Sequence, residues 1–81
     1  MRKMVKVNIN SPRLKYYIKQ YGGLKRVGNN PIFTYSIQSV YLGLRDWGMS
    51  IELVSQLSEI LGVKASEFAD IDGYLTKLHL K

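Results

Sequence analysis

Four breaks divide this chain of 81 residues into short segments, and they restrict its fold more than any other feature. They are Gly22-Gly23, Asn29-Asn30-Pro31, Gly48 and Gly62. Between them, apolar residues recur at spacings of three and four, which is typical of amphipathic helices. Because short helices are stable only when their apolar stripes pack together, we expect a mainly α fold. It would be one compact domain, residues 1–81, of four to five helices, with residues 12–70 as the helical core.

The first two expected helices lie within residues 12–29. One begins at Pro12 with Ser11 as its N-cap, because proline suits the first helical position and a serine hydroxyl can accept a free backbone N–H. Its apolar stripe is Leu14, Tyr17, Ile18 and Tyr21. Gly22-Gly23 ends this helix, and residues 24–29 have room for two further turns at most.

The third helix is expected to begin either at Pro31, capped by Asn30, or at Ser36, capped by Thr34 or by Ser36 itself. Its buried stripe is expected to be Phe33, Ile37, Val40, Tyr41 and Leu44. Its opposite side is expected to hold Tyr35, Gln38, Ser39, Leu42 and Arg45. Gly48 ends the helix, and Trp47 is expected to fill the core between two helices.

Local signals also define the next two helices. Ser50 is the expected N-cap of the fourth, and Gly62 is its expected left-handed C-cap, with Val63 packing back over the last turn. The core side of this helix is Leu53, Val54, Leu57, Ile60 and Leu61. Residues 66–69 predict a short fifth helix.

Both ends of the chain show alternation, which is typical of half-buried strands. Val5, Val7 and Ile9 alternate with polar residues, so residues 1–10 form a short strand or a basic arm. After an expected Asp72-Gly73 turn, residues 74–81 alternate in the same way and predict a closing strand or a tail. This strand could pair with the first, in the same chain or in a second subunit.

The charges of the chain are divided between its two halves. All six acidic residues lie beyond residue 45, whereas nine of the twelve Lys and Arg residues lie at or before it. Such a polarised field favours a polyanionic partner, in particular nucleic acid. The alternative is an ordinary solvated basic surface.

Short helices, a basic first half and a polar side on the third helix together fit a helix-turn-helix DNA-binding protein. One helix would enter the major groove, and the surface beside it would hold phosphates. The candidate base contacts are Tyr35, Gln38, Ser39, Leu42 and Arg45. Glutamine can pair with adenine, arginine with guanine, and a leucine side chain can touch a thymine methyl. The candidate phosphate contacts are Lys15, Lys25, Arg26, Asn30 and Thr34.

The stretch 49–68 ends a leucine-rich helix in Leu-Gly-Val and continues as Ser66-Glu67-Phe68, and Arg13-Leu14-Lys15-Tyr16-Tyr17 opens the first helix. In these features residues 12–70 resemble the phage Cro and repressor family, the XRE-type helix-turn-helix regulators. The resemblance implies a homodimeric regulator of transcription that binds double-stranded DNA, from a phage or another mobile element. Gly28 matches the small residue of the family's second helix, but residues 29–32 replace the compact turn, which predicts an enlarged connection.

Other functions are compatible with the same residues. The scaffold could be a protein-binding module, an inhibitor or anti-repressor that docks on an acidic protein surface, or an architectural protein similar to excisionases. Exposed Tyr16 and Tyr35 could instead stack on single-stranded bases.

Nothing in the sequence predicts catalysis. Cysteine is absent, His79 is the single histidine, and Asp70-Ile71-Asp72-Gly73 lacks the further ligands of a calcium loop. We therefore expect a non-enzyme without cofactor or metal. No apolar run is long enough to span a bilayer, so we expect a cytoplasmic protein without a membrane partner.

Overall fold

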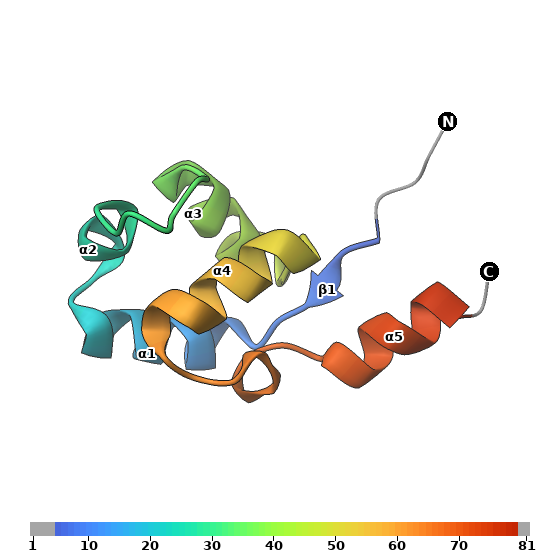
Figure 1. Cartoon of the computed structure of the whole chain (residues 1–81). Coiled ribbons are helices and arrows are strands. Elements are labelled where there is room, and N and C mark those ends of the chain that lie inside the picture. Colours follow the sequence, from blue (N-terminus) through green and yellow to red (C-terminus); the bar gives the residue numbers. More distant parts are fainter. Residues whose placement is uncertain (1–4, 80–81) are drawn as a thin grey trace.

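The computed structural model describes residues 5–79, except for the side chain of His79. This part of the chain is mainly helical, as predicted, with one small two-stranded sheet (Figure 1). In chain order the elements are β1 (Val7–Asn8), α1 (Ser11–Tyr21), α2 (Leu24–Gly28), α3 (Ile37–Asp46), β2 (Gly48–Met49), α4 (Ile51–Leu61), the 3-10 helix η1 (Ala65–Glu67) and α5 (Ile71–His79). No helix within residues 5–79 is both long enough and apolar enough to cross a membrane.

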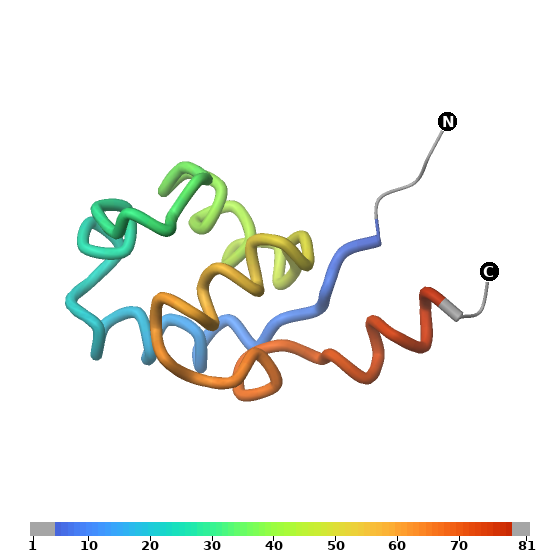
Figure 2. The backbone as a smooth tube through the Cα atoms, in the orientation of Figure 1, coloured from blue at the N-terminus to red at the C-terminus, as the bar shows by residue number. Residues whose placement is uncertain are grey.

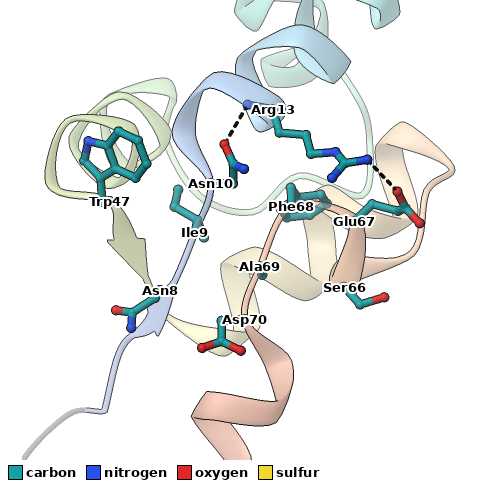
Figure 3. A pocket seen from close by; sticks show the side chains of 10 residues that line it. All are labelled: Asn8, Ile9, Asn10, Arg13, Trp47, Ser66, Glu67, Phe68, Ala69 and Asp70. Carbon is teal, nitrogen blue, oxygen red and sulfur yellow. Dashed lines mark hydrogen bonds and ion pairs between the residues drawn. The ribbon is translucent and has the colours of Figure 1, made fainter.

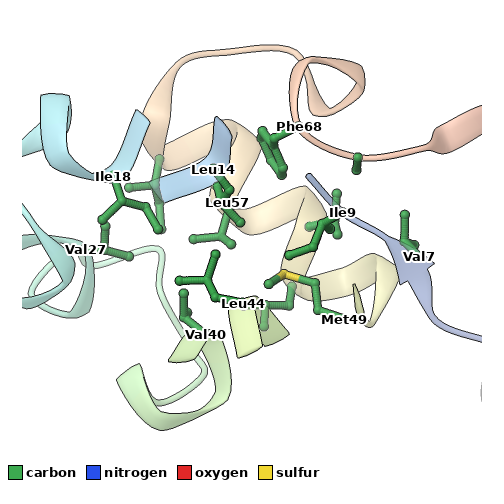
Figure 4. Packing of buried hydrophobic residues seen from close by; sticks show 14 residues of the cluster. Val7, Ile9, Leu14, Ile18, Val27, Val40, Leu44, Met49, Leu57 and Phe68 are labelled. Atoms are coloured by element: carbon green, nitrogen blue, oxygen red, sulfur yellow. The ribbon is translucent and has the colours of Figure 1, made fainter. Parts of the chain in front are cut away.

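The core lies between α1, α2, α3 and α4 and is closed at one end by β1, β2 and the segment after η1 (Figure 4). Its buried apolar members are Val7, Ile9, Leu14, Ile18, Val27, Val40, Leu44, Met49, Leu53, Val54, Leu57, Ile60, Phe68 and Ala69. The stripes predicted for α1 and α4 are confirmed, although Tyr17, Tyr21 and Leu61 are only half-buried.

Two predicted caps of α4 are confirmed, and the predicted cap of α1 is wrong. Ser50 Oγ accepts the N–H of Leu53 at 3.3 Å, and Gly62 ends α4 in the left-handed region at φ 71°. At α1 it is the side chain of Asn10 that accepts a backbone N–H, that of Arg13 at 3.1 Å. Ser11 is buried instead, because its hydroxyl donates at 2.6 Å to the carbonyl oxygen of Leu44 on α3.

Helix α3 begins at the later of the two predicted positions, with Ser36 as its N-cap. The predicted burial of Ile37 and Tyr41 is wrong, since they are 41% and 55% exposed. The helix instead turns Gly43 toward the core, where a Cβ at this position would lie 2.5 Å from Cε of Met49. The missing side chain lets α3 lie close against β2, which rotates Tyr41 outward.

Trp47 ends α3 in the left-handed conformation, with φ at 58°, one residue before the predicted Gly48. The prediction that Trp47 fills the core is wrong, because the residue is 54% exposed. The chain then enters β2, whose Met49 takes the core position.

The predicted N-terminal strand is present, but the predicted C-terminal strand is wrong. β1 pairs antiparallel with β2, with Val7 opposite Met49, and Ile9 forms a bridge with Ala69. Residues 71–79 form α5, which extends away from α1–α4 and contacts β1 (Figure 2). Asp70 caps the start of this helix, because its Oδ1 accepts the N–H of Gly73 at 3.0 Å. The predicted turn at Asp72-Gly73 is therefore wrong, since both residues lie within α5. Residues 80 and 81 of the predicted strand lie outside the described part of the chain.

The remaining short elements agree with their predicted positions. α2 occupies residues 24–28 of the predicted segment 24–29, and it contributes Val27 to the core. The predicted short helix at residues 66–69 appears as the single turn η1, after which Phe68 and Ala69 are buried.

Candidate nucleic-acid interface

The exposed side of α3 carries Gln38, Tyr41, Leu42 and Arg45, which we call the α3 face. These residues have the spacing i, i+3, i+4 and i+7, so they lie on one side of the helix, opposite Val40 and Leu44 in the core. Three of the four were predicted base contacts, and Tyr41 was missed because it was assigned to the core. The face offers an amide, a guanidinium, a phenol and an aliphatic side chain to a partner.

The other two candidate base contacts lie at the edge of this face. Tyr35 precedes α3 and is 37% exposed. Ser39 is half-buried, and its Oγ lies 3.1 Å from Oγ of the capping residue Ser36. Ser39 therefore stabilises the start of α3 and lies at the side of the α3 face.

Helix α2 lies along one flank of α3. At Gly28, an added Cβ would lie 2.9 Å from both Cγ1 and Cδ1 of Ile37, so the two helices approach closely at this glycine. Ile37 and Tyr41 are one turn apart and share the flank that faces α2. Gly28 is therefore the small residue that lets α2 and α3 approach each other.

The connection between α2 and α3, residues 29–36, is longer than a compact turn, as predicted. Hydrogen bonds of side chains fix its conformation. Asn30 Nδ2 donates to the Tyr21 hydroxyl at 2.9 Å, and Asn30 Oδ1 accepts the N–H of Ile32 at 2.9 Å. Gln56 on α4 accepts the N–H of Thr34 at 3.0 Å and donates to its Oγ1 at 2.6 Å. Most of the polar atoms of Asn30 and Thr34, two candidate phosphate contacts, are thus used inside the protein.

The basic candidates are exposed and lie on α1 and α2. Lys15 is one turn beyond Ser11, whose hydroxyl bonds to α3, so Lys15 lies on the flank of α1 that faces α3. Lys25 is exposed on α2. The guanidinium of Arg26 lies over the Tyr21 ring, 5.5 Å from its centre, and its aliphatic part lies beside Gly22.

Not all the basic residues of the first half gather near the α3 face. Arg13 lies on α1 about 200° from Lys15, and its Nη2 is 3.5 Å from Oε1 of Glu67 on η1. Arg45 contacts the neighbouring Asp46, with its Nε 3.2 Å from Oδ1. Both ion pairs are exposed, and pairs of this kind contribute little to stability, so Arg45 can leave Asp46 for another partner.

On the flank of α3 away from α2, a pocket of about 270 Å³ lies between α3 and β2. Leu42, Gly43, Met49 and Leu53 supply its apolar lining, and its polar lining comes from Lys6, Tyr35, Ser39, Asp46 and Ser50. Lys6, on the segment before β1, was not among the candidate site residues, because only the pairing of β1 with β2 brings it next to α3.

A second pocket, of about 370 Å³, lies between β1, Trp47 and η1 (Figure 3). Its lining includes Asn8, Asn10, Trp47 and the Arg13–Glu67 ion pair, and none of the residues of the α3 face. Within residues 5–79, no group of three His, Cys, Asp or Glu side chains lies close enough to hold a metal ion.

In comparisons with known proteins, no family model, no curated protein and no solved structure matches this chain.

Proposed function

We propose that this protein is a sequence-specific regulator of transcription of Cro or repressor type, which binds double-stranded DNA through α3. The observation that carries the proposal is the α3 face, where Gln38, Leu42 and Arg45 are exposed together on one helix. The major groove admits an α-helix, and amide and guanidinium groups distinguish adenine and guanine there. Leu42 would contact a thymine methyl, and Tyr35 and Ser39 would contact bases near the start of α3.

Phosphates beside the groove would be bound by residues of the helices next to α3. Lys15 and Lys25 are exposed there. Arg26 is also exposed, although its aliphatic atoms lie beside Gly22. Asn30 would donate the second proton of its side-chain amide, since the first is donated to Tyr21. Thr34 would donate its hydroxyl proton, since its Oγ1 only accepts from Gln56. With about four to six neutralised phosphates, affinity would fall by about two to three orders of magnitude between 50 and 200 mM salt.

The test is to select duplexes from a random pool with the wild-type protein and to measure their affinities in a gel-shift titration. Gln38→Ala and Arg45→Ala should each reduce discrimination between the selected and an unrelated duplex by about 1–3 kcal/mol. Lys64→Ala removes the same charge as Arg45→Ala from an exposed position after α4, and it should leave discrimination unchanged. A salt-independent affinity, or equal discrimination in all variants, would exclude this function.

A protein-binding module is the second candidate, and the exposure of apolar side chains on and beside α3 favours it. Tyr41 is 55% exposed, Ile37 41% and Ile32 43%. Aromatic and aliphatic side chains of this kind are common at protein interfaces, where tyrosine is a frequent hot spot. Under this alternative Tyr41→Ala abolishes capture of a protein partner, and Gln38→Ala has no effect on any duplex.

We further propose that the protein acts as a homodimer in the cytoplasm of a bacterial cell and derives from a phage or mobile element. α5 offers a contact for a second copy, because Ile71, Tyr74, Leu75 and Leu78 share one side and the two leucines are 45% and 40% exposed. Sedimentation equilibrium of the wild type and of Leu75→Glu would show a dimer and a monomer, respectively.

A further inference from the structure

The two flanks of α3 differ in what lies beside them. On one flank is α2, with Lys25 and Arg26, and on the other is the pocket between α3 and β2, with Lys6. Ile37 and Tyr41 belong to the α2 flank, and Ser39 and Leu42 belong to the pocket flank, since successive residues of a helix are 100° apart. A basic residue thus lies beside each flank, Lys25 of α2 on one and Lys6 on the other, whereas Arg26 is about 160° around α2 from Gly28 and lies over Tyr21 of α1.

The position of Lys6 is defined by the sheet. β1 pairs with β2 so that Asn8 lies opposite Gly48, and a Cβ at Gly48 would lie 3.8 Å from Cβ and 3.9 Å from Cδ of Lys6. The aliphatic stem of Lys6 therefore runs over Gly48, in contact with β2. Lys6 is one of the residues that line the pocket, and within residues 5–79 it forms no ion pair.

The polar lining of this pocket suits an anion. Tyr35, Ser39 and Ser50 line it and carry hydroxyl groups, and hydroxyl and ammonium groups are common phosphate ligands. Ser50 Oγ accepts the N–H of Leu53, so its own proton remains available to an anion. Asp46 is the one acidic residue of the lining, and in the free protein its Oδ1 is 3.2 Å from Nε of Arg45.

A helix in the major groove has a phosphate backbone on each side, because the groove is bounded by the two strands. α2 is placed to contact one of these backbones. We infer that Lys6 and the hydroxyl groups of the pocket bind a phosphate of the other DNA strand, the one that α2 does not contact. This inference rests on the proposed function. The segment that precedes β1 would then contact DNA, while β1 itself completes the sheet.

The experiment compares Lys6→Gln with wild type on the duplex that wild type selects and on an unrelated duplex. Lys6→Gln loses one phosphate contact, so log Kobs should fall less steeply with log salt, with a slope smaller in magnitude by about 0.9. The fold-loss of affinity should be the same on both duplexes, because a phosphate contact is independent of sequence. Lys6→Arg keeps the charge and should keep the slope. Lys77→Gln makes the same charge change on α5 and should also keep the wild-type slope.

A second measurement locates the contact on the DNA. In a series of duplexes with single neutral methylphosphonate groups, one position on the strand opposite the α2 contacts should weaken wild type but have no effect on Lys6→Gln. Wild-type binding with an unchanged slope in Lys6→Gln, or the absence of such a position, would overturn the inference and leave the proposed function standing. If wild type binds no duplex, both are overturned.

Discussion

The Ser11 hydroxyl connects the start of α1 to the end of α3. It is buried, and it donates to the carbonyl oxygen of Leu44. Because α3 ends at Asp46, this carbonyl has no helical N–H four residues later to bond it. One side chain thus satisfies a helix terminus that lies inside the protein and fixes α3 relative to α1.

Replacing Ser11 with Ala should lower the free energy of unfolding by about 1–2 kcal/mol, because the buried Leu44 carbonyl loses its partner. Urea unfolding followed by circular dichroism measures the change. Ser55→Ala is the matched control, since Ser55 is exposed on α4, and its effect should stay within about 0.5 kcal/mol. Equal effects of the two replacements would show that the Ser11 hydrogen bond contributes nothing to stability.

At the scale of elements, the approach of α2 to α3 depends on one small residue. Gly28 leaves the space that Ile37 occupies, and Ile37 is on the same helix as the proposed base contacts. A larger side chain at position 28 would push the helices apart or displace Ile37, so the placement of the α3 face depends on this contact.

Gly28→Val should therefore destabilise the domain by about 1–3 kcal/mol and weaken binding of the selected duplex. Adding Ile37→Ala should restore part of both, because it removes the side chain that the new methyl groups meet. A double-mutant cycle in unfolding and in DNA affinity measures this coupling. Strict additivity of the two changes would mean that the pair does not set the spacing of the helices.

The elements that could be predicted from sequence are those whose signals are local. α1 and α4 have clear stripes and breaks, and Ser50 and Gly62 cap α4 through their own neighbours. The rotation of α3 could not be predicted, because it depends on the contact of Gly43 with Met49. α5 was predicted as a strand because residues 74–81 alternate, while the helical spacing of Ile71, Tyr74, Leu75 and Leu78 fits equally well.

The same distinction holds for the candidate site. The exposure of Gln38, Leu42 and Arg45 followed from helical spacing alone. Gln56 and Lys6 were missed, because they reach the connection and the α3 flank only through tertiary contacts. Asn30 was predicted to contact phosphate, since nothing local shows that its amide bonds to Tyr21.

At the scale of the whole molecule, the division of charge along the chain is also a division between elements of the structure. The described basic residues of the first half lie before β1 and on α1, α2 and α3. The described acidic residues lie at the end of α3 and on α4, η1, α5 and the segment between the last two. The α3 face and its basic flanks would therefore meet DNA, and the later elements would point away from it. α5, which extends from the other helices, is then available for a second copy (Figure 1).

The most direct test of this account is a titration of isotope-labelled protein with the selected duplex, followed through the backbone amide resonances. We predict that the largest changes in amide chemical shift occur at Lys6, in α2 and across residues 35–45. The amide shifts of η1 and of the residues that line the pocket between β1, Trp47 and η1 should change little. Changes confined to η1, Trp47 and α5, with residues 35–45 unaffected, would contradict the central claim that α3 is the DNA-binding element.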